Sequence, residues 1–207
     1  MYACRARFHP SQLHASLRSL VTTFVPTLTT ERLVLRPLDS SDSAALAALN
    51  ADPEVTRFTS PDGLPLSPED SWRQLAMLVG HWQLRGFGMW AVAERERPDF
   101  LIGRIGCHQP DGWPDFEIGW ALASSCWGRG YATEGAAAAI RYAFEVLERP
   151  RVVSLIDPAN MRSRAVAERL GEQRVGEWMM RGRRVDIYGI EADAWRQRWA
   201  SHYTTEY

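Results

Sequence analysis

The chain has 207 residues, and hydrophobic residues make up 45% of them, which suits one domain with a sizeable core and excludes global disorder. Lysine and arginine number 24 against 25 aspartates and glutamates, a net charge of −1. That balance lacks the basic excess of dedicated nucleic-acid-binding proteins, and no apolar run reaches the about 20 residues that span a bilayer. We therefore expect neither a nucleic-acid partner nor a membrane partner.

Residues 1–27 stand apart from the rest because they contain three arginines and no acidic residue. An acid-free leader with arginines is one feature of transit peptides. We favour the alternative, a flexible N-terminal extension, and the segment lacks the apolar centre of a secretory signal. The predicted organisation is this extension, a single domain over 28–200 and a C-terminal tail over 201–207.

The cysteines Cys4, Cys107 and Cys126 are few, odd in number and form no C-x-x-C pair. Such usage indicates reduced thiols and a cytoplasmic location. The five histidines are scattered along the chain, so no metal site is predicted.

The first half of the chain predicts a strand, two helices and three further strands. Thr30–Leu38 carries β-branched and apolar residues typical of a strand. One helix is expected after the capping run Asp39–Asp42. A second begins at Ser67, where a capping side chain precedes Pro68 and two acidic residues, and should end before Gly86. The three following strands are Phe87–Ala93, Phe100–Cys107 and Asp115–Leu122.

The second half alternates helices and strands. A helix over Gly130–Leu147 separates the strand Asp115–Leu122 from the strand Val152–Ile156, and such a crossover predicts one parallel pair. The remaining elements are a helix over Asn160–Leu170, strands over Arg174–Met180 and Arg184–Ile190, and a helix over Asp193–Trp199. The predicted fold class is therefore α/β (α+β), with a mixed, mostly antiparallel central sheet flanked by helices.

The most informative segment is a strand, a glycine-bearing loop and a helix, with Gly128 and Gly130 on either side of Arg129. A helix N-terminus offers unpaired N–H groups and a partial positive charge, and glycines let an anion approach the backbone. The segment is not a P-loop, because no Lys-Ser/Thr follows, and it does not fit the G-x-G-x-x-G spacing. Taken alone, the glycines could equally serve only to turn the chain.

With its neighbours, the segment resembles the signature Q/R-x-x-G-x-G/A of the GNAT superfamily of N-acetyltransferases. Trp127 stands at the Q/R position, Gly130 at the glycine and Ala132 at the last position. Trp127 departs from the pattern, which is tolerable where backbone groups bind the anion. The blocks E-I-G-W-A-L, N-x-x-S…L-G at Asn160–Gly171 and D-I-Y-G before Trp195 are similar to the branch of ribosomal-protein N-terminal acetyltransferases (RimJ/RimL-like). The resemblance covers residues 28–200.

This resemblance implies a GNAT-like fold that binds acetyl-CoA, with the one parallel strand pair splayed around the cofactor. The pyrophosphate would lie on the glycine loop, and the pantetheine arm would follow the exposed main chain of the preceding strand. Asn160 would bind pantetheine, although it also suits a plain helix cap. The implied cofactor-binding residues are Trp120, Ala121, Leu122, Trp127, Gly128, Arg129, Gly130, Tyr131, Ala132, Thr133 and Asn160.

The resemblance also implies direct attack of an amine on the thioester, without an acyl-enzyme. The amine must be neutral to attack, so a base is needed. Glu117 is the candidate, and the alternative is a surface or ion-paired carboxylate. No Tyr lies between Asn160 and Gly171, where many relatives keep a proton donor for the leaving thiolate. Ser163 is the nearest substitute, and the alternative is a hydroxyl that bonds the start of the helix.

The predicted function is transfer of an acetyl group from acetyl-CoA to a primary amine, on a protein N-terminus or a small molecule. The missing Tyr and the unusual Trp127 keep a second hypothesis open, a catalytically silent acyl-CoA-binding module. A nucleotide-dependent enzyme is disfavoured by the missing Lys-Ser/Thr. The last two strands could also form a homodimer contact.

Overall fold

The computed structural model describes residues 24–180 and 182–199. The predictions for residues 1–23 and for the tail 201–207 lie outside the described residues. One sheet of eight strands runs through the structure in the order β1-β2-β3-β4-β5-β6-β8-β7. The strands are β1 Leu28–Thr29, β2 Leu33–Arg36, β3 Met89–Glu94, β4 Gly103–His108, β5 Glu117–Leu122, β6 Arg151–Ile156, β7 Gln173–Met180 and β8 Arg183–Glu191. Every neighbouring pair is antiparallel except β5 and β6, which confirms the predicted mixed sheet with one parallel pair.

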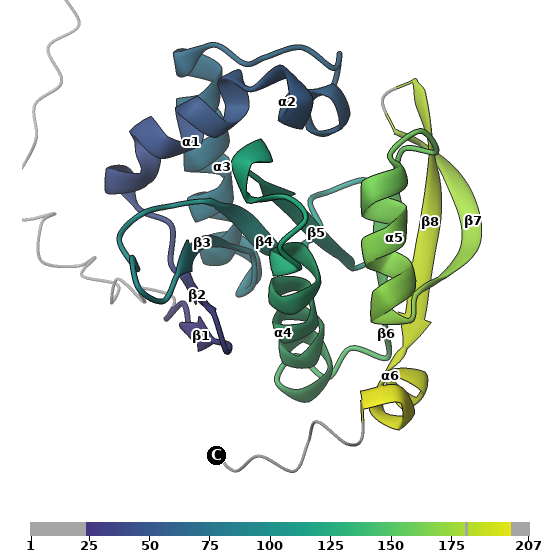
Figure 1. The fold of residues 1–207 in the computed structure, drawn as a ribbon. Helices are drawn as coiled ribbons and strands as arrows, with labels where there is room; N and C mark the ends of the chain where they lie inside the picture. Colours follow the sequence, from purple (N-terminus) through teal and green to yellow (C-terminus); the bar gives the residue numbers. More distant parts are fainter. Residues whose placement is uncertain (1–23, 181, 200–207) are drawn as a thin grey trace, which may run out of the picture.

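The helices pack on the two faces of this sheet. They are α1 Ser43–Ala51, α2 Pro53–Thr59, α3 Pro68–Arg85, α4 Tyr131–Glu145, α5 Met161–Leu170 and α6 Ala192–Trp199. Core residues of α1 and α3 contact Met89, Ala91 and Ala121 on one face, whereas those of α4 and α5 contact Ile105 and Ile118 on the other. Figure 1 shows α4 and α5 side by side in front of the sheet. No helix of the described segments is long and apolar enough to cross a membrane.

Local signals fix several element ends where they were expected. The Ser67 side chain accepts a hydrogen bond from the Asp70 amide at the start of α3, with Pro68 in the first turn. Gly86 ends α3 with φ of 75°, a left-handed conformation that glycine adopts at little cost. The Asn160 side chain caps α5, and Gly171 ends it with φ of 92°.

Two elements differ from the sequence prediction. The expected strand Thr30–Leu38 is two strands, because a turn closed by the bond from the Thr30 amide to the Leu33 carbonyl separates β1 from β2. Helix α2 was not predicted, yet its signal is present in the sequence: Asp52 accepts from the Glu54 amide, and Pro53 occupies the first turn. Because α2 is short and has no long apolar periodicity, its capping residues are its only sequence signal.

The sheet divides where β5 meets β6. The two strands share one register pair, Glu117 with Val153, whereas β6 and β8 share six from Arg151 to Ile156. Helix α4 packs on β5 and α5 on β6, and Figure 1 shows the two helices side by side over this part of the sheet. The fold therefore leaves backbone groups of β5 without a strand partner at this point.

Candidate active site

A cleft of about 1640 Å³ lies between α4 and α5 at the end of β5. It is larger than the roughly 300–1,000 Å³ of sites for drug-sized ligands, so it can hold a long ligand. All eleven sequence-predicted cofactor residues and Ser163 line it: Trp120, Ala121, Leu122, Trp127, Gly128, Arg129, Gly130, Tyr131, Ala132, Thr133, Asn160 and Ser163. The fold thus brings together segments that are about 40 residues apart in sequence.

The glycine loop presents backbone to this cleft. Gly128 and Gly130 have φ of 76° and 81°, and a Cβ built on Gly128 would meet no atom within 4 Å. Gly130 is the N-cap of α4, and no side chain accepts from the first amides of the helix. Open space above glycine and free N–H groups at a helix N-terminus fit an anion such as a pyrophosphate.

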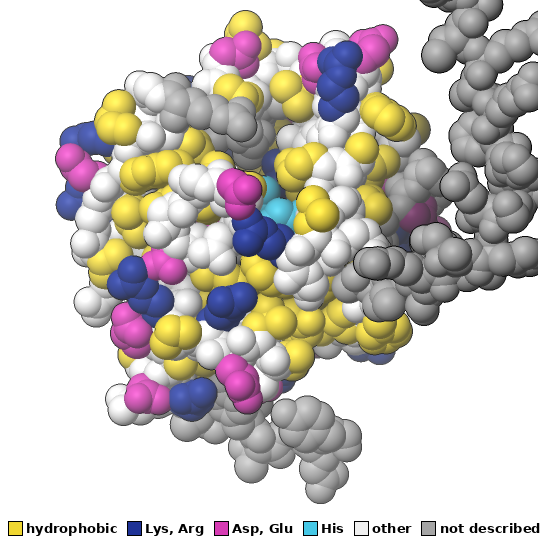
Figure 2. Space-filling model, turned by 180° about the vertical axis from the view of Figure 1, so that it is seen from behind, with side chains coloured by type: hydrophobic (Ala, Val, Ile, Leu, Met, Phe, Trp, Pro, Cys, Tyr) yellow, Lys and Arg dark blue, Asp and Glu magenta, His cyan; other side chains and the backbone are white. Residues whose placement is uncertain are grey.

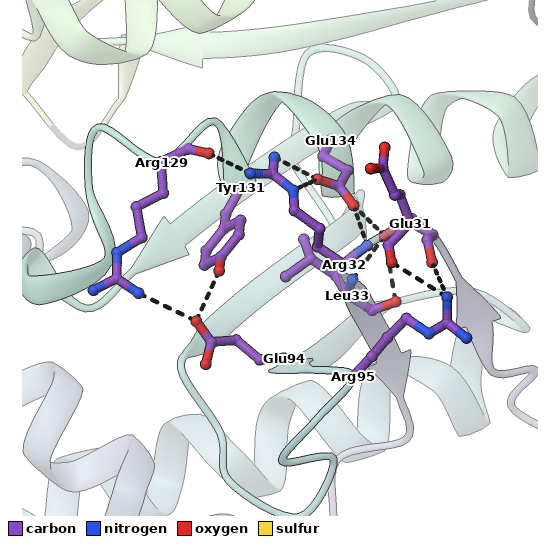
Figure 3. Close-up of polar contacts among 9 residues, drawn as sticks. Glu31, Arg32, Leu33, Glu94, Arg95, Arg129, Tyr131 and Glu134 are labelled. Carbon is purple, nitrogen blue, oxygen red and sulfur yellow. Dashed lines mark hydrogen bonds and ion pairs between the residues drawn. The ribbon is translucent and has the colours of Figure 1, made fainter.

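An ionic network holds this loop against the start of the domain (Figure 3). Glu134, in the first turn of α4, accepts from the Arg32 amide at 2.8 Å and from its Nε at 2.7 Å. Arg32 in turn donates to the Arg129 carbonyl at 2.9 Å. The Arg129 side chain turns to Glu94 at 3.2 Å, so a carboxylate already neutralises the basic group that the sequence offered to an anion.

The charge balance within this network favours ionised Glu134. Burial opposes the charged form, but hydrogen bonds from Thr30 and Arg32 outweigh burial, and the pKa of Glu134 is lowered. From the sequence alone, an acidic residue in the first turn of a helix such as Glu134 suits the helix dipole, and nothing there links it to Arg32 or links Arg129 to Glu94. Arg32 lies 102 residues from Glu134 in the sequence, and Glu94 lies 35 residues from Arg129. No local sequence pattern could therefore have revealed these contacts.

Trp127 anchors the loop rather than offering a polar group. Its indole Nε1 donates to the Leu122 carbonyl at 2.9 Å, and the Arg162 guanidinium stacks over the ring at 4.4 Å. The ring also packs against the core. The departure from the usual polar residue is therefore compatible with a stable loop, because the indole links the end of β5 to α5.

Asn160 and Ser163 lie on the opposite wall of the cleft. The Asn160 Oδ1 accepts from the Ser163 amide at 3.1 Å, which is the predicted cap, and within the described structure its amide nitrogen donates to no group. The Ser163 Oγ accepts from the Trp120 indole at 3.3 Å. An indole is only a donor, so the Ser163 hydroxyl proton remains available to the cleft.

Glu117 does not line the cleft; it points to the opposite face of the sheet. Ile118 packs under α4, so the alternation of a strand turns Glu117, Gly119 and Ala121 toward the α3 face. Ala121 nevertheless lines the cleft, because β5 and β6 have separated there. The cleft therefore opens between the strands toward the face that carries Glu117.

The environment of Glu117 suits a base. Its Oε2 accepts from the Trp113 indole at 2.6 Å. Burial raises the pKa of Glu117 to about 7, although hydrogen bonds from Trp113 and the Leu155 amide and the charge of Arg104 lower it. A carboxylate with a pKa near neutrality can take a proton from an amine and release it again at neutral pH.

The face around Glu117 carries further polar groups. His108 lies directly across from Glu117 in the strand register, and its ring stacks on His81 at 5.3 Å. Burial, with the charges of His81 and Arg104, lowers the pKa of His108 to about 3, so His108 is neutral. Figure 2, seen from behind, shows histidine atoms at the bottom of a hollow bordered by hydrophobic and charged side chains.

Glu172 is a buried carboxyl that lies near Ile118 and Ser154, where β5 and β6 meet, and the sequence analysis missed it. It is 2% exposed, and its Oε1 is 3.0 Å from the Ser154 Oγ, which is also 2.9 Å from the Ile118 carbonyl. The single proton of Ser154 can serve only one of these acceptors, so both bonds exist together when Glu172 is protonated. Burial raises the pKa of Glu172 to about 8, the nearby negative charge of Glu117 adds to the rise, and only the bond with Ser154 opposes it.

The described residues include two cysteines and no cluster of metal-ligating side chains. Cys107 and Cys126 are both buried, and burial strongly raises the pKa of Cys107. No cluster of three or more metal-ligating side chains occurs in residues 24–180 and 182–199. Burial thus disfavours the nucleophilic thiolate form of Cys107.

Comparisons with known proteins agree with this geometry. Residues 32–173 match the family model of the Acetyltransferase (GNAT) domain. The chain is 29% identical over 168 residues to "Uncharacterized N-acetyltransferase p20" of Bacillus licheniformis, covering 78% of this chain and 93% of the relative. An acetyltransferase from Agrobacterium tumefaciens is similar in structure, with a TM-score of 0.72, 34% identity and coverage of 81% and 95%.

The fold is shared more widely. A RimL ribosomal L7/L12 α-N-protein acetyltransferase in complex with coenzyme A has a TM-score of 0.65 at 22% identity, covering 82% of this chain and 98% of that one. This likeness is one of fold. The match to the family model spans well over half of the sequence, and the same segment forms the cleft, the glycine loop and the splayed strands. The chain belongs to the GNAT family of acetyltransferases.

Proposed function

We propose that this protein transfers an acetyl group from acetyl-CoA to a primary amine, with Glu117 as general base. The observation that supports this most is the placement of a carboxylate with a pKa of about 7 on the strand whose far end lines the large cleft. GNAT acetyltransferases take their acetyl group from acetyl-CoA, and a structure of this fold is in complex with coenzyme A. When bound, acetyl-CoA supplies a thioester carbonyl that the amine can attack and a sulfur that can leave.

The binding step rests on the α4 N-terminus and the splayed edge of β5. Amides at Gly130–Thr133 face the cleft and suit the pyrophosphate. Arg141 and Arg169 also line the cleft. Among residues 24–180 and 182–199, neither guanidinium forms an ion pair, a hydrogen bond or a ring contact, so both are available to the phosphates of the cofactor.

Attack of the amine on the thioester needs a hydrogen-bond donor for the oxyanion that develops on the carbonyl oxygen. The carbonyls of Phe116 and Ile118 point from β5 toward β6, where they accept from the Val153 amide and the Ser154 hydroxyl. A residue's N–H and C=O point the same way in a strand, so the Trp120 amide also points into the gap. Strand β6 has no residue paired with Trp120. The Trp120 amide can therefore donate to the attacked carbonyl oxygen and stabilise its negative charge.

The proton steps use one group on each side of the sheet. Glu117 takes a proton from the acceptor ammonium before the attack, directly or through a water, and so leaves a neutral amine that can attack. As the carbon–sulfur bond breaks, the Ser163 hydroxyl donates a hydrogen bond to the leaving sulfur. A coenzyme thiol with a pKa near the cysteine reference of about 8.5 needs little further help.

The test is an acetyl-transfer screen that measures thiol release from acetyl-CoA with primary amines, amino acids and ribosomal-protein N-terminal peptides. The proposal expects release with at least one acceptor class, and acetylated product by mass spectrometry. Tight binding of acetyl-CoA without release on any acceptor would support the silent acyl-CoA-binding module instead.

A further inference from the structure

Arg104, on β4, is a half-buried arginine with no protein acceptor. Within the described segments its guanidinium makes no hydrogen bond, ion pair or aromatic contact, and its Nε is sealed from solvent without a partner. Its terminal nitrogens are not sealed in this way. The only other described arginines without such a contact, Arg141 and Arg169, are exposed and line the cofactor cleft.

The guanidinium of Arg104 lies on the face of Glu117. Ile105 and Cys107 point into the core under α4, so the alternation of β4 turns Arg104, Gly106 and His108 to the opposite face. The positive charge of Arg104 lowers the pKa of both Glu117 and His108. It is therefore close to both groups, yet it forms no ion pair with Glu117.

Two glycines lie between Arg104 and Glu117 on this face, and atoms of Met89 fill the space next to both of them. Gly106 lies opposite Gly119 in the register, between the pair Arg104–Ala121 and the pair His108–Glu117. The Met89 methyl group lies over Gly119, 2.8 Å from where a Cβ would be. A methionine side chain is unbranched and adaptable, so a small ligand that reaches both charged groups would displace the Met89 methyl group.

An arginine in this setting points to an anionic ligand. Burial disfavours its charge and lowers the pKa of Arg104, but arginine remains charged in proteins. A partly desolvated cation without a protein partner is unfavourable for folding. The planar fork of arginine matches a carboxylate bidentately.

We propose that Arg104 binds a carboxylate carried by the amine acceptor, so that the acceptor is an amino acid or a molecule with the same pairing of amine and carboxylate. The inference rests on the proposed function and names the substrate class of that site. The amine would lie beside Glu117 and the carboxylate at Arg104, with the Met89 methyl group displaced from between them. His108 is neutral and adds no competing charge.

The test compares matched triplets of acceptors: a set of free L-amino acids, their primary carboxamides and the corresponding decarboxylated amines. Thiol release from acetyl-CoA gives kcat/KM for each. A charge-assisted bidentate contact corresponds to about 10–100-fold, so the acids should exceed both neutral analogues by that factor. Peptides with a C-terminal amide and an N-terminal Asp or Glu form a further arm, since their side chain could supply the same carboxylate.

The variant Arg104→Gln should abolish this preference, mainly by raising KM for the acids, while Arg104→Lys keeps the charge and should retain part of it. Arg141→Gln is the matched control: it removes an arginine from the cofactor cleft and should leave the ratio of acid to amide unchanged. Equilibrium binding of N-acetyl-amino acids and their carboxamides provides a second readout that needs no turnover, with the same expected preference and the same loss in Arg104→Gln.

Two results distinguish failure of the role proposed for Arg104 from failure of the proposed acetyltransferase function. If amines are acetylated but acids and amides react equally well in the wild type, the role of Arg104 is overturned and the acetyltransferase stands. If no acceptor releases thiol, the proposed function fails, and the binding readout still decides Arg104: equal affinity for acids and amides overturns it. Preferential use of acidic peptides over free amino acids would support Arg104 and place the carboxylate on a protein N-terminus.

Discussion

The two faces of the splayed strand β5 are built on different physical terms. The cofactor cleft on the α4 side relies on backbone: left-handed glycines, free amides at the α4 N-terminus and exposed arginines. The opposite face relies on half-buried side chains, where partial burial raises the pKa of Glu117 and lowers that of His108. Binding of a large anion needs no shifted pKa, whereas proton transfer at neutral pH does.

The largest effect should follow from removing the base on the buried side. Glu117→Gln keeps the shape of the side chain but cannot take a proton, so kcat should fall by about 10²–10⁴-fold. In the wild type, the rate should rise with pH through about 7, because only the ionised form of Glu117 is a base. The pH–rate profile of the variant should lack this limb; a profile that keeps it would assign the proton transfer to another group.

The buried carboxyl of Glu172 predicts that the stability of the protein depends on pH. The pKa of Glu172 is raised from 4.5 to about 8 in the folded state, so its contribution is fully present below about pH 4.5 and is lost as pH rises toward 8. The free energy of unfolding should fall by up to about 1.4 kcal/mol per pH unit in that window. Denaturant unfolding at pH 5, 6, 7 and 8 measures it.

The variant Glu172→Gln should flatten this slope, because the amide can still donate to Ser154 and carries no titrating proton. Glu69→Gln, in the exposed first turn of α3, is the matched control and should leave the slope unchanged. Equal slopes in the wild type and Glu172→Gln would show that Glu172 is ionised in the folded protein across this range.

On the cofactor side, the sensitive positions should be glycines. Gly130→Ala forces a residue with φ of 81° to carry a Cβ, 3.3 Å from the Arg32 guanidinium. Left-handed backbone costs about 1–2 kcal/mol for a residue with a Cβ, so the Kd for acetyl-CoA should rise by roughly tenfold. Gly86→Ala imposes the same strain at the end of α3 with open space around the Cβ, and should lower stability without changing this Kd.

The smallest effects should come from the exposed arginines. Arg141→Gln and Arg169→Gln each remove a solvent-exposed charge from the cleft. Exposed charge pairs contribute about 0.2–1 kcal/mol, so the KM for acetyl-CoA should rise up to about fivefold at low salt and less at high salt. Arg73→Gln, on the exposed side of α3 where it pairs with Asp70, should change neither value.

The contrast between the two faces of β5 also explains which parts of the site could be predicted from the sequence. Signals of the backbone-built side are local: glycines, a helix start and the cap at Asn160. Together they carry the family resemblance, and that resemblance named the lining residues. The side built from buried side chains depends on contacts between distant strands. Arg104 looks like an ordinary outward residue of an alternating strand, and Glu172 looks like an exposed acid after the helix stop Gly171. Only the fold shows that one lacks a partner and the other is buried.

The most direct test of the account measures acetyl-CoA binding and acetyl transfer side by side in the wild type and Glu117→Gln. The account predicts equal Kd values for acetyl-CoA, because Glu117 does not line the cofactor cleft, together with thiol release that is fast in the wild type and at least about a hundredfold slower in the variant. Equal rates of thiol release in the two proteins, with the best acceptor of the screen, would contradict it.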